Sequence, residues 1–482
     1  MSIKKNFIYN MIYQIIIIII PLITTPYISR IIGPEGVGIQ AYTYSIASYF
    51  VLFAMLGVNN HGNRSIAMTR NDKKRLSETF FCIFYLKAIV SVIVIIVYCI
   101  YIIFAQQQYR ILLIINLLYV LAALVDINWF FFGMEKFKLT VIRNVVIRVI
   151  SVISIFIFVK QSSDLYIYVF ILALGNLISQ LILWKYLFKY IDKTKVGIKN
   201  IFNQLKPTLV LFIPVLAISV YQIMDKIMIG YMSNVVQVGY YENSERIIKI
   251  PIAVIISLGT VMLPKMCNLQ AIGDYSKVKS YISNSMEYVM FMSIGAVFGL
   301  IGISNVFIPL FLGDNFKSCI ELVSLLSITI IFIAWANVIR TQYLIPMKMD
   351  KEYITSTILG AIVNFTINFI LIREYGAKGA VVGTVFAEAI VAIYQTIKVK
   401  KYLEIGIYIK KSIFYTIPGS IMCLCVIYIG NVFEKSAWGA VIQLIVGGFI
   451  YISISIVYMI IIKNEFIISL LNTLKNKLIN KK

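Results

Sequence analysis

The sequence has little charge and almost no histidine. Only 13% of its 482 residues are charged, whereas a soluble domain carries about 25%. A single histidine, His61, speaks against a Ser-His-Asp catalytic site, a histidine proton relay or a metal site held by several histidines. The six cysteines are scattered without metal-binding or redox spacing, which is typical of small buried apolar side chains. We therefore expect no catalytic residue, no metal site and no cofactor.

Long apolar runs fill the chain instead. Hydrophobic residues make up 60% of it, and blocks of about twenty apolar residues, each able to cross a hydrocarbon layer of roughly 30 Å, recur from end to end. The segments between them, about a dozen residues each, are too short to form a folded domain outside the membrane. The pattern predicts an all-α, polytopic membrane protein with about 14 transmembrane helices. The predicted spans are 7–32, 36–58, 79–104, 110–132, 139–159, 164–189, 206–231, 238–264, 284–309, 318–345, 353–372, 378–400, 411–431 and 438–462.

The distribution of the basic residues along the chain indicates membrane topology rather than a polyanionic partner in solution. The formal net charge is +23, which in a soluble protein would indicate nucleic acid. With both termini on one side, however, about 30 of the 44 Lys and Arg residues fall on that side. Because cytoplasmic loops of membrane proteins carry the excess of basic residues, we expect both termini in the cytoplasm and no nucleic-acid partner.

A weak internal repeat divides the spans into two halves. A proline-bearing helix followed by a short turn and a Val-Gly step occurs twice, at Val37-Gly38 and at Val238-Gly239, and internal repeats are the usual build of secondary transporters. The predicted organisation is an N-terminal lobe of helices 1–6 (1–189), a cytoplasmic linker with an interfacial helix (190–206), a C-terminal lobe of helices 7–12 (207–400), and helices 13 and 14 with a basic amphipathic tail (401–482). The tail, at 464–482, is expected to anchor to anionic membrane lipids.

Charged side chains inside the spans are the candidate functional residues, because each costs at least about 2.5–3.5 kcal/mol to insert. Span 8 carries Glu242, Glu245, Arg246 and Lys249 at positions i, i+3, i+4 and i+7, so all four share one face of the helix. Lipid cannot solvate that face. Two interpretations stay open: i, i+4 pairs neutralise the face and hold helices together, or the face lines a hydrated cavity.

Further intramembrane charges lie on the N-terminal spans. Arg143 and Arg148 are five residues apart, about 140° around the helix, so we expect them to point in different directions. In one interpretation, one of them pairs with Asp126 while the other faces a cavity, and we expect at least one of the two to face a cavity. Arg30 and Asp225 lie near the outer ends of spans 1 and 7.

An arginine-lined cavity suits a polyanionic head group, because guanidinium binds phosphate oxygens in pairs and stays charged. Five tyrosines, Tyr42, Tyr44, Tyr221, Tyr240 and Tyr241, would suit sugar faces, although aromatic residues are routine at membrane interfaces. The candidate binding residues are Arg30, Arg143, Arg148, Arg246 and Lys249. The candidates for ion coupling or internal pairing are Asp126, Asp225, Glu242, Glu245 and Glu388.

Three segments resemble a known family. The run Ser29–Gly38 (Ser-Arg-Ile-Ile-Gly-Pro-Glu-Gly-Val-Gly), after a proline-bearing first helix, resembles the Wzx-type polysaccharide repeat-unit flippases. These belong to the multidrug/oligosaccharidyl-lipid/polysaccharide (MOP) exporter superfamily. Asp225–Gly230 followed by Val238–Tyr241 is similar to the signature of its seventh and eighth helices, and Gly376–Thr384 to that of its eleventh and twelfth.

The resemblance implies two six-helix lobes around a central cationic cavity, with two further helices, in the bacterial cytoplasmic membrane. It implies alternating access that carries an undecaprenyl-diphosphate-linked oligosaccharide from the inner to the outer leaflet for surface polysaccharide assembly. Membrane lipids and other polysaccharide-assembly proteins are the further partners that it allows. Arg30 matches the first-helix arginine of the family, and Arg246 lies where members place charge on helix eight. Glu242 and Glu245 depart from the pattern, because they make the outer cavity less cationic.

Two other functions compete with this interpretation. A multidrug or cation antiporter of the same superfamily would need an acidic or apolar chamber, which these charges do not predict. A membrane-embedded polysaccharide polymerase or glycosyltransferase would need a sizeable outer loop, and every predicted outer loop is under about ten residues. We therefore expect a transporter and not an enzyme.

Overall fold

A computed structural model describes residues 3–433 and 436–461, with side chains from Ile19 onward apart from those of Tyr221 and Thr260. These residues are helical almost throughout and include no strand. Thirteen helical segments among them are long and apolar enough to cross a membrane. The first, Ile19–Thr69, contains 51 residues, whereas one crossing needs about 20; it includes part of the first predicted span and all of the second. The predicted all-α, multi-pass membrane fold is confirmed.

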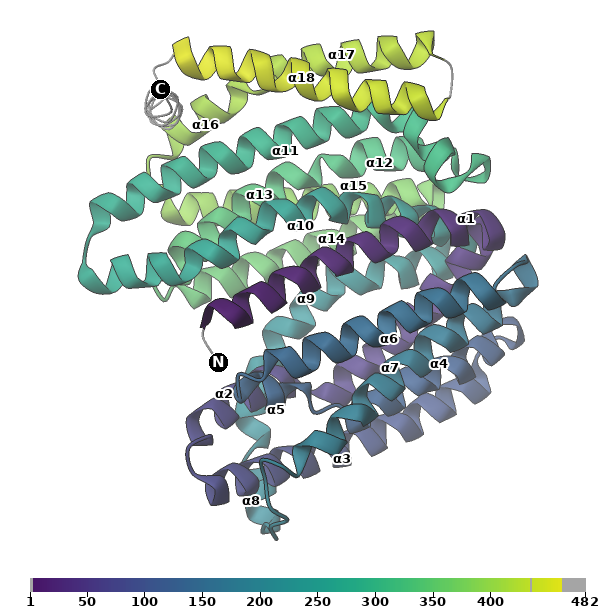
Figure 1. Cartoon of the computed structure of the whole chain (residues 1–482), viewed down its shortest axis with the longest axis vertical. Coiled ribbons are helices and arrows are strands. Elements are labelled where there is room, and N and C mark those ends of the chain that lie inside the picture. The colour runs from purple at the N-terminus through teal and green to yellow at the C-terminus, as the bar shows by residue number, and fades with distance from the viewer. Residues whose placement is uncertain (1–2, 434–435, 462–482) are drawn as a thin grey trace, which may run out of the picture. The chain divides into compact units, whose positions relative to one another are not determined.

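The helices form two compact units (Figure 1). Unit 1 comprises the described residues of Met1–Glu242 and Ile372–Ala377, and unit 2 those of Asn243–Leu371 and Lys378–Lys482. The division between the units falls inside the helix that contains Glu242 and Asn243, and not at 190–206. The two six-helix lobes stay a prediction from the sequence. Unit 1 contains α1 (Ile3–Met55), α2 (Val58–Thr69), α3 (Lys73–Phe104), α4 (Gln107–Val125), α5 (Asn128–Gly133), α6 (Phe137–Phe158), η1 (Ser162–Asp164), α7 (Leu165–Leu187), α8 (Ile198–Phe202), α9 (Leu205–Met232) and the start of α10 (Val235–Ile272). Unit 2 contains the rest of α10, α11 (Tyr275–Leu312), η2 (Asp314–Phe316), α12 (Cys319–Ser327), α13 (Thr329–Ile339), η3 (Arg340–Leu344), most of α14 (Asp350–Tyr375) and α15 (Ala377–Val399), α16 (Ile405–Phe414), α17 (Thr416–Val432) and α18 (Ala437–Ile461).

A single glycine separates the first two predicted spans. Gly33 has a φ of 74° and breaks the helical geometry of α1, a conformation that glycine adopts without the steric penalty of a side chain. Pro34 follows it, and a proline is well placed at the start of a helix because it has no N–H to leave unpaired there. Pro21 and Pro26 lie within continuous helix.

The two Val-Gly steps of the internal repeat pack against each other in unit 1. A β-carbon on Gly38 would overlap the backbone carbonyl of Val235, and one on Gly239 would overlap that of Pro34. Only glycine permits this approach of backbone to backbone. The third segment that carries the resemblance also reaches this contact, because the Ala377 N–H donates to Gln237 Oε1 at 3.1 Å. The repeat is therefore a packing motif as well as a sequence pattern.

Aromatic packing holds the end of unit 1 that contains α2 and α5. Trp129 has no exposed surface and lies beside Phe80, with their ring centroids 5.4 Å apart. A β-carbon on Gly62 of α2 would overlap the Trp129 ring, so this glycine lets α2 and α5 meet. In unit 2, α11 packs against α13, α17 and α18. Glu287 of α11, largely buried, binds Lys411 Nζ at 3.0 Å and accepts a hydrogen bond from the Tyr415 hydroxyl at 3.2 Å.

The linker predicted at 190–206 is largely irregular. Its helix, α8, has five residues and packs against α3. Ile201 is buried, while Ile198 is 72% exposed, which is the two-sided pattern expected of a segment at a membrane surface. The amphipathic tail predicted at 464–482 lies outside the described residues.

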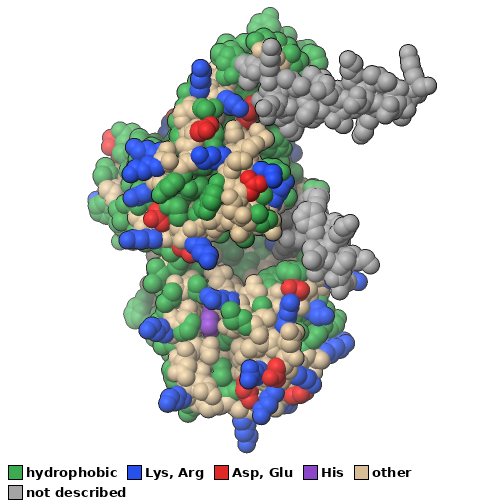
Figure 2. Space-filling view, turned by 90° about the vertical axis from the view of Figure 1, so that its left-hand side faces the viewer, with side chains coloured by type: hydrophobic (Ala, Val, Ile, Leu, Met, Phe, Trp, Pro, Cys, Tyr) green, Lys and Arg blue, Asp and Glu red, His purple; other side chains and the backbone are tan. Residues whose placement is uncertain are grey.

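The exterior of both units is rich in apolar side chains, as a surface in contact with lipid requires. Figure 2 shows one face, marked by the purple side chain of His61, on which Lys and Arg side chains gather.

Candidate functional site

Unit 1 contains a polar cavity of about 720 Å³. Asp126, Arg143 and Arg148, three of the candidate residues from the sequence, line it together. They are its charged side chains, and most of the other polar lining groups are amides and hydroxyls. We call it the polar cavity; its polar lining comprises Thr24, Tyr44, Asn59, Asn60, Asn63, Tyr119, Asp126, Asn128, Arg143, Asn144, Arg148, Ser151, Tyr168, Asn176, Ser179 and Gln180.

A break in a predicted span forms one wall of this cavity. The fourth span, predicted as continuous over 110–132, is interrupted between α4 and α5, so that prediction is wrong. The cause is Asp126, whose carboxylate accepts hydrogen bonds from the backbone N–H and the Nδ2 of Asn128 at 2.7 and 3.0 Å. Lys87, which is fully buried, donates from Nζ to the backbone carbonyl of Asp126. Non-helical backbone at membrane depth is tolerated where it is buried or lines a cavity, and both conditions hold here.

A hydrogen-bond network connects this break to α6 and α7. Arg143 Nη2 donates to Asn128 Oδ1 at 2.9 Å and to Asn144 Oδ1 at 2.7 Å. Asn128 Nδ2 donates to Gln180 Oε1 at 2.8 Å, and Ser179 Oγ donates to Asn144 Oδ1 at 3.2 Å. Asn128 thus bridges the Arg143 guanidinium and the Asp126 carboxylate.

Arg143 and Arg148 both line the polar cavity, whereas the sequence predicted a cavity position for at least one of them. Their Cα atoms are about 140° apart around the helix, but the cavity is wide enough to be reached from both directions. Arg143 is 6% exposed and Arg148 is half-buried.

Amide side chains are the part of the site that the sequence argument missed. Asn59, Asn60 and Asn63 come from α2, where the sequence predicted a cytoplasmic loop, and Asn176 and Gln180 come from α7. Their spacing of three or four residues places them on one face of each helix. This spacing of polar residues beside apolar runs is the feature of the sequence from which a polar helix face could have been predicted.

Tyrosines complete the lining. Tyr44 is one of the five tyrosines noted in the sequence, and its ring lies 5.0 Å from that of Tyr119, another lining residue. Tyr168 lines the cavity as well. The side chain of Tyr221, another of the five, lies outside the described part of the chain.

Two of the predicted acidic residues lie elsewhere in unit 1 and are engaged by neighbours. Asp225 is 1% exposed and accepts a hydrogen bond from the Tyr241 hydroxyl at 2.6 Å. Glu242 forms an ion pair with Lys226 at 2.6 Å, with both side chains more than four-fifths buried. These contacts favour internal pairing over a cavity role for the beginning of span 8.

The candidate residues of unit 2 lie on two helices, α10 and α15. Glu245 and Lys249 form the predicted i, i+4 pair at 2.8 Å, in which Lys249 is 58% exposed. Arg246 lies between them and is half-buried. Glu388 of α15 is partly buried and attracted by the charge of Arg340. Arg30, in unit 1, is exposed.

The polar cavity can bind neutral and anionic groups. Amides donate and accept hydrogen bonds, as sugar hydroxyls require, and two arginines against one aspartate leave it positively charged. Aromatic rings pack against apolar faces.

Comparison with known proteins identifies the family of the chain. The profile of a family described as "Polysaccharide biosynthesis protein" matches residues 3–270, more than half of the chain. The chain belongs to this polysaccharide biosynthesis family. The matched segment contains every lining residue of the polar cavity.

Curated members of similar sequence are named as transporters. The chain is 25% identical over 405 residues to "Putative O-antigen transporter" of Shigella dysenteriae, covering 82% of this chain and 100% of the relative. A protein of the same name from Escherichia coli (strain K12) is 23% identical over 404 residues, covering 81% of this chain and 95% of the relative.

A solved structure shares the fold. The structure titled "Lipid II flippase MurJ, inward closed conformation" superposes with a TM-score of 0.76 at 17% identity, covering 96% of this family member and 100% of that chain. The family match confirms the predicted relationship to polysaccharide biosynthesis proteins, and the superposition shows a shared fold.

Proposed function

We propose that this protein is a flippase for undecaprenyl-diphosphate-linked oligosaccharide. It moves the lipid-linked repeat unit from the inner to the outer leaflet of the bacterial cytoplasmic membrane by alternating access, for surface polysaccharide assembly. The observation that carries the proposal is the polar cavity of about 720 Å³, lined by arginine and amide side chains inside an apolar helical unit. The names of the transporters that it resembles support the same substrate class.

The physical task explains the residues. A diphosphate carries about two negative charges, and moving it bare through hydrocarbon is prohibitive. Arg143 and Arg148 offset that cost by charge-assisted hydrogen bonds to phosphate oxygens, while the asparagines replace water around the glycan hydroxyls. Arg30, Arg246 and Lys249 stay candidate binding residues. Asp225, Glu242, Glu245 and Glu388 stay candidates for ion coupling or structural pairing.

The cavity disfavours export of cationic drugs. Its charged lining residues are two arginines and one aspartate, and Asp126 already accepts two hydrogen bonds from Asn128. A cation entering it would meet repulsion from two guanidinium groups. We propose neither a cofactor nor a catalytic step, since translocation forms no bond and breaks none. The termini lie in the cytoplasm in this proposal, in keeping with the positive-inside excess.

A cellular test addresses the function directly. Bacteria depleted of their own flippase for a surface polysaccharide are supplied with this chain, and the glycan on the cell surface is measured with an impermeant lectin. Restored surface glycan is the expected result, and Arg143→Gln is expected to restore less. Glycan that stays inside, with the protein correctly inserted and several repeat-unit chemistries tried, would overturn the proposal.

A further inference from the structure

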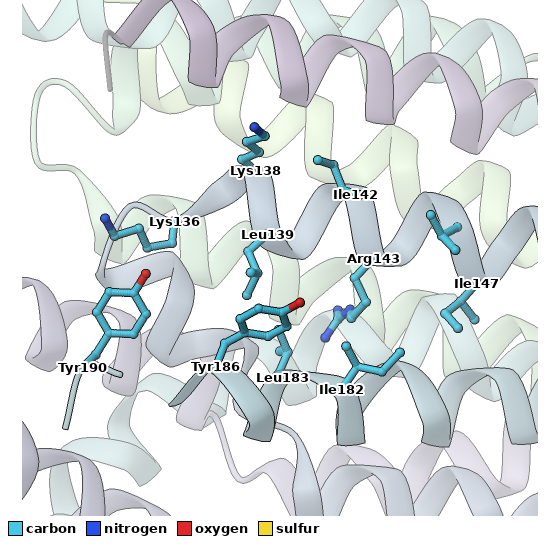
Figure 3. A pocket seen from close by; sticks show the side chains of 11 residues that line it. Lys136, Lys138, Leu139, Ile142, Arg143, Ile147, Ile182, Leu183, Tyr186 and Tyr190 are labelled. Atoms are coloured by element: carbon cyan, nitrogen blue, oxygen red, sulfur yellow. The ribbon is translucent and has the colours of Figure 1, made fainter. Parts of the chain in front are cut away.

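The two helices that carry the arginine network diverge at one end. At Gly175 of α7, a β-carbon would lie 2.8 Å from Ser151 Oγ of α6, so the helices are closely packed there. Toward Lys136 they separate, and a second cavity of about 490 Å³ opens between them. Figure 3 shows this opening, with Lys136 and Tyr190 at one end and Ile147 at the other. We call it the α6–α7 groove.

The groove has an apolar wall and a basic rim. Leu139, Ile142, Val146, Ile182 and Leu183 supply the wall, and Ile142 and Val146 are 45% and 49% exposed. Lys136 and Lys138 stand at the rim and are exposed. Lys136 Nζ lies 5.5 Å from the centre of the Tyr190 ring, a cation–π contact that holds the ammonium at the mouth of the groove.

Arg143 and Ile147 line the α6–α7 groove and the polar cavity alike. In Figure 3 the Arg143 side chain points from α6 toward α7 and ends close to Ile182. Its hydrogen bonds to Asn128 and Asn144 place the guanidinium at the junction. One side of that junction is apolar, the junction is cationic, and the other side is rich in amides.

We propose that the α6–α7 groove binds the phosphate-proximal end of the substrate's own polyprenyl chain. The isoprene units lie along the apolar wall, Arg143 faces the diphosphate at the junction, and the glycan lies in the polar cavity, while Lys136 and Lys138 add positive charge at the rim. From the groove to the polar cavity, the lining changes from apolar to cationic to amide-rich. This order matches the order of polyprenyl chain, diphosphate and glycan along the substrate. A membrane phospholipid would match only the first two. This inference rests on the proposed function and assigns the substrate a place in unit 1.

Site-specific photocrosslinking in nanodiscs tests the groove without requiring transport. The photoreactive residue p-benzoylphenylalanine replaces Ile142, and in a control protein it replaces Ile153, which is 53% exposed on the same helix but lines neither cavity. The probe is radiolabelled undecaprenyl diphosphate without sugars. We expect strong labelling at position 142 and little at 153. Lys136→Gln and Lys138→Gln should each lower the labelling about threefold, as loss of a partly exposed charge contact does.

Competition identifies the occupant. Unlabelled undecaprenyl diphosphate should abolish the labelling, and an equal excess of phosphatidylglycerol should leave it. Equal competition by phosphatidylglycerol would mean that an ordinary anionic lipid fills the groove and would overturn the inference. Equal labelling at 142 and 153 would overturn it as well, because the groove would then be no different from the lipid-facing surface.

Filling the groove separates this inference from the proposed function. Val146→Trp and Ile142→Trp place an indole in the open groove, and Ile153→Trp is the matched control. We expect the first two to lower labelling and transbilayer movement of glycan-bearing lipid at least about tenfold, as loss of a buried chain contact does, and the control to leave both unchanged. If the protein transports the glycan-bearing lipid but is not labelled at position 142, the polyprenyl site in the groove is refuted and the flippase function stands. Specific labelling without any transport would refute the flippase function and leave the groove as a polyprenyl-diphosphate site.

Discussion

Replacing Arg143 with glutamine tests the role of the cationic junction. The guanidinium is 6% exposed and its Nη2 donates to Asn128 and Asn144 at 2.9 and 2.7 Å. A hydrogen bond to a charged group contributes about 1.5–3 kcal/mol. If Arg143 gives one such bond to a phosphate oxygen of the substrate, Arg143→Gln should slow transport about 10- to 100-fold. Arg143→Lys keeps the charge but loses the planar fork, so we expect an intermediate rate.

The assay is the initial rate of transbilayer movement in proteoliposomes with matched protein content. Thermal unfolding in detergent measures stability separately, because the variant also loses hydrogen bonds inside unit 1. Arg110→Gln is the control: this arginine is exposed on α4 and donates to the backbone carbonyl of Ile103 at 3.1 Å. The reasoning is refuted if Arg143→Gln transports within about twofold of the wild type, or if Arg110→Gln loses as much.

Three further outcomes follow from contacts in the two units. Gly38→Ala places a methyl group against backbone and should lower the free energy of unfolding by about 1–3 kcal/mol. The control Gly448→Ala, which has open space around its β-carbon, should not lower it. Thermal unfolding in detergent measures both variants. Lys226→Glu should destabilise unit 1 through repulsion between the new carboxylate and Glu242. The double variant Lys226→Glu/Glu242→Lys, which exchanges the two charges, should recover most of the lost stability. A double variant no more stable than the single one would contradict the ion pair. Asp126→Ala should cost about 1–3 kcal/mol by removing the two hydrogen bonds that Asp126 accepts from Asn128. Asp126→Asn should retain most of that stability, since its amide oxygen can accept the same hydrogen bonds; equal losses in both variants would contradict the role of these bonds.

Much of the fold was predictable because lipid imposes a simple rule on composition. Apolar runs of about twenty residues place the spans, and each predicted range overlaps described helix, although α10 and α11 extend well beyond the predicted ends. Gly33 reduces a predicted turn to one residue. Asp126 interrupts a span that composition alone marks as continuous, because its carboxylate competes for the backbone N–H of Asn128.

The candidate site was predictable in its charges and not in its amides. Arg143, Arg148 and Asp126 were identified because ionisable groups are expensive in membranes, and the structure places all three on one cavity. Inserting an asparagine into a membrane costs less free energy than inserting a charged residue, so an asparagine in an apolar run is a weaker indication of function. For this reason Asn59 and Asn176 were missed. Side-chain partners such as Lys226 with Glu242 depend on helix packing, which spacing along the chain does not determine.

The central claim is that this chain moves a lipid-linked glycan across a bilayer. The most direct test reconstitutes the purified protein in liposomes with undecaprenyl-diphosphate oligosaccharide in both leaflets and follows its accessibility to an external glycan-modifying enzyme. We predict that the protein makes the protected half of the substrate accessible and that Arg143→Gln slows this exchange. A protected pool that stays protected across several glycans and imposed ion gradients, while a cationic dye is transported, would contradict the account and favour a cation antiporter.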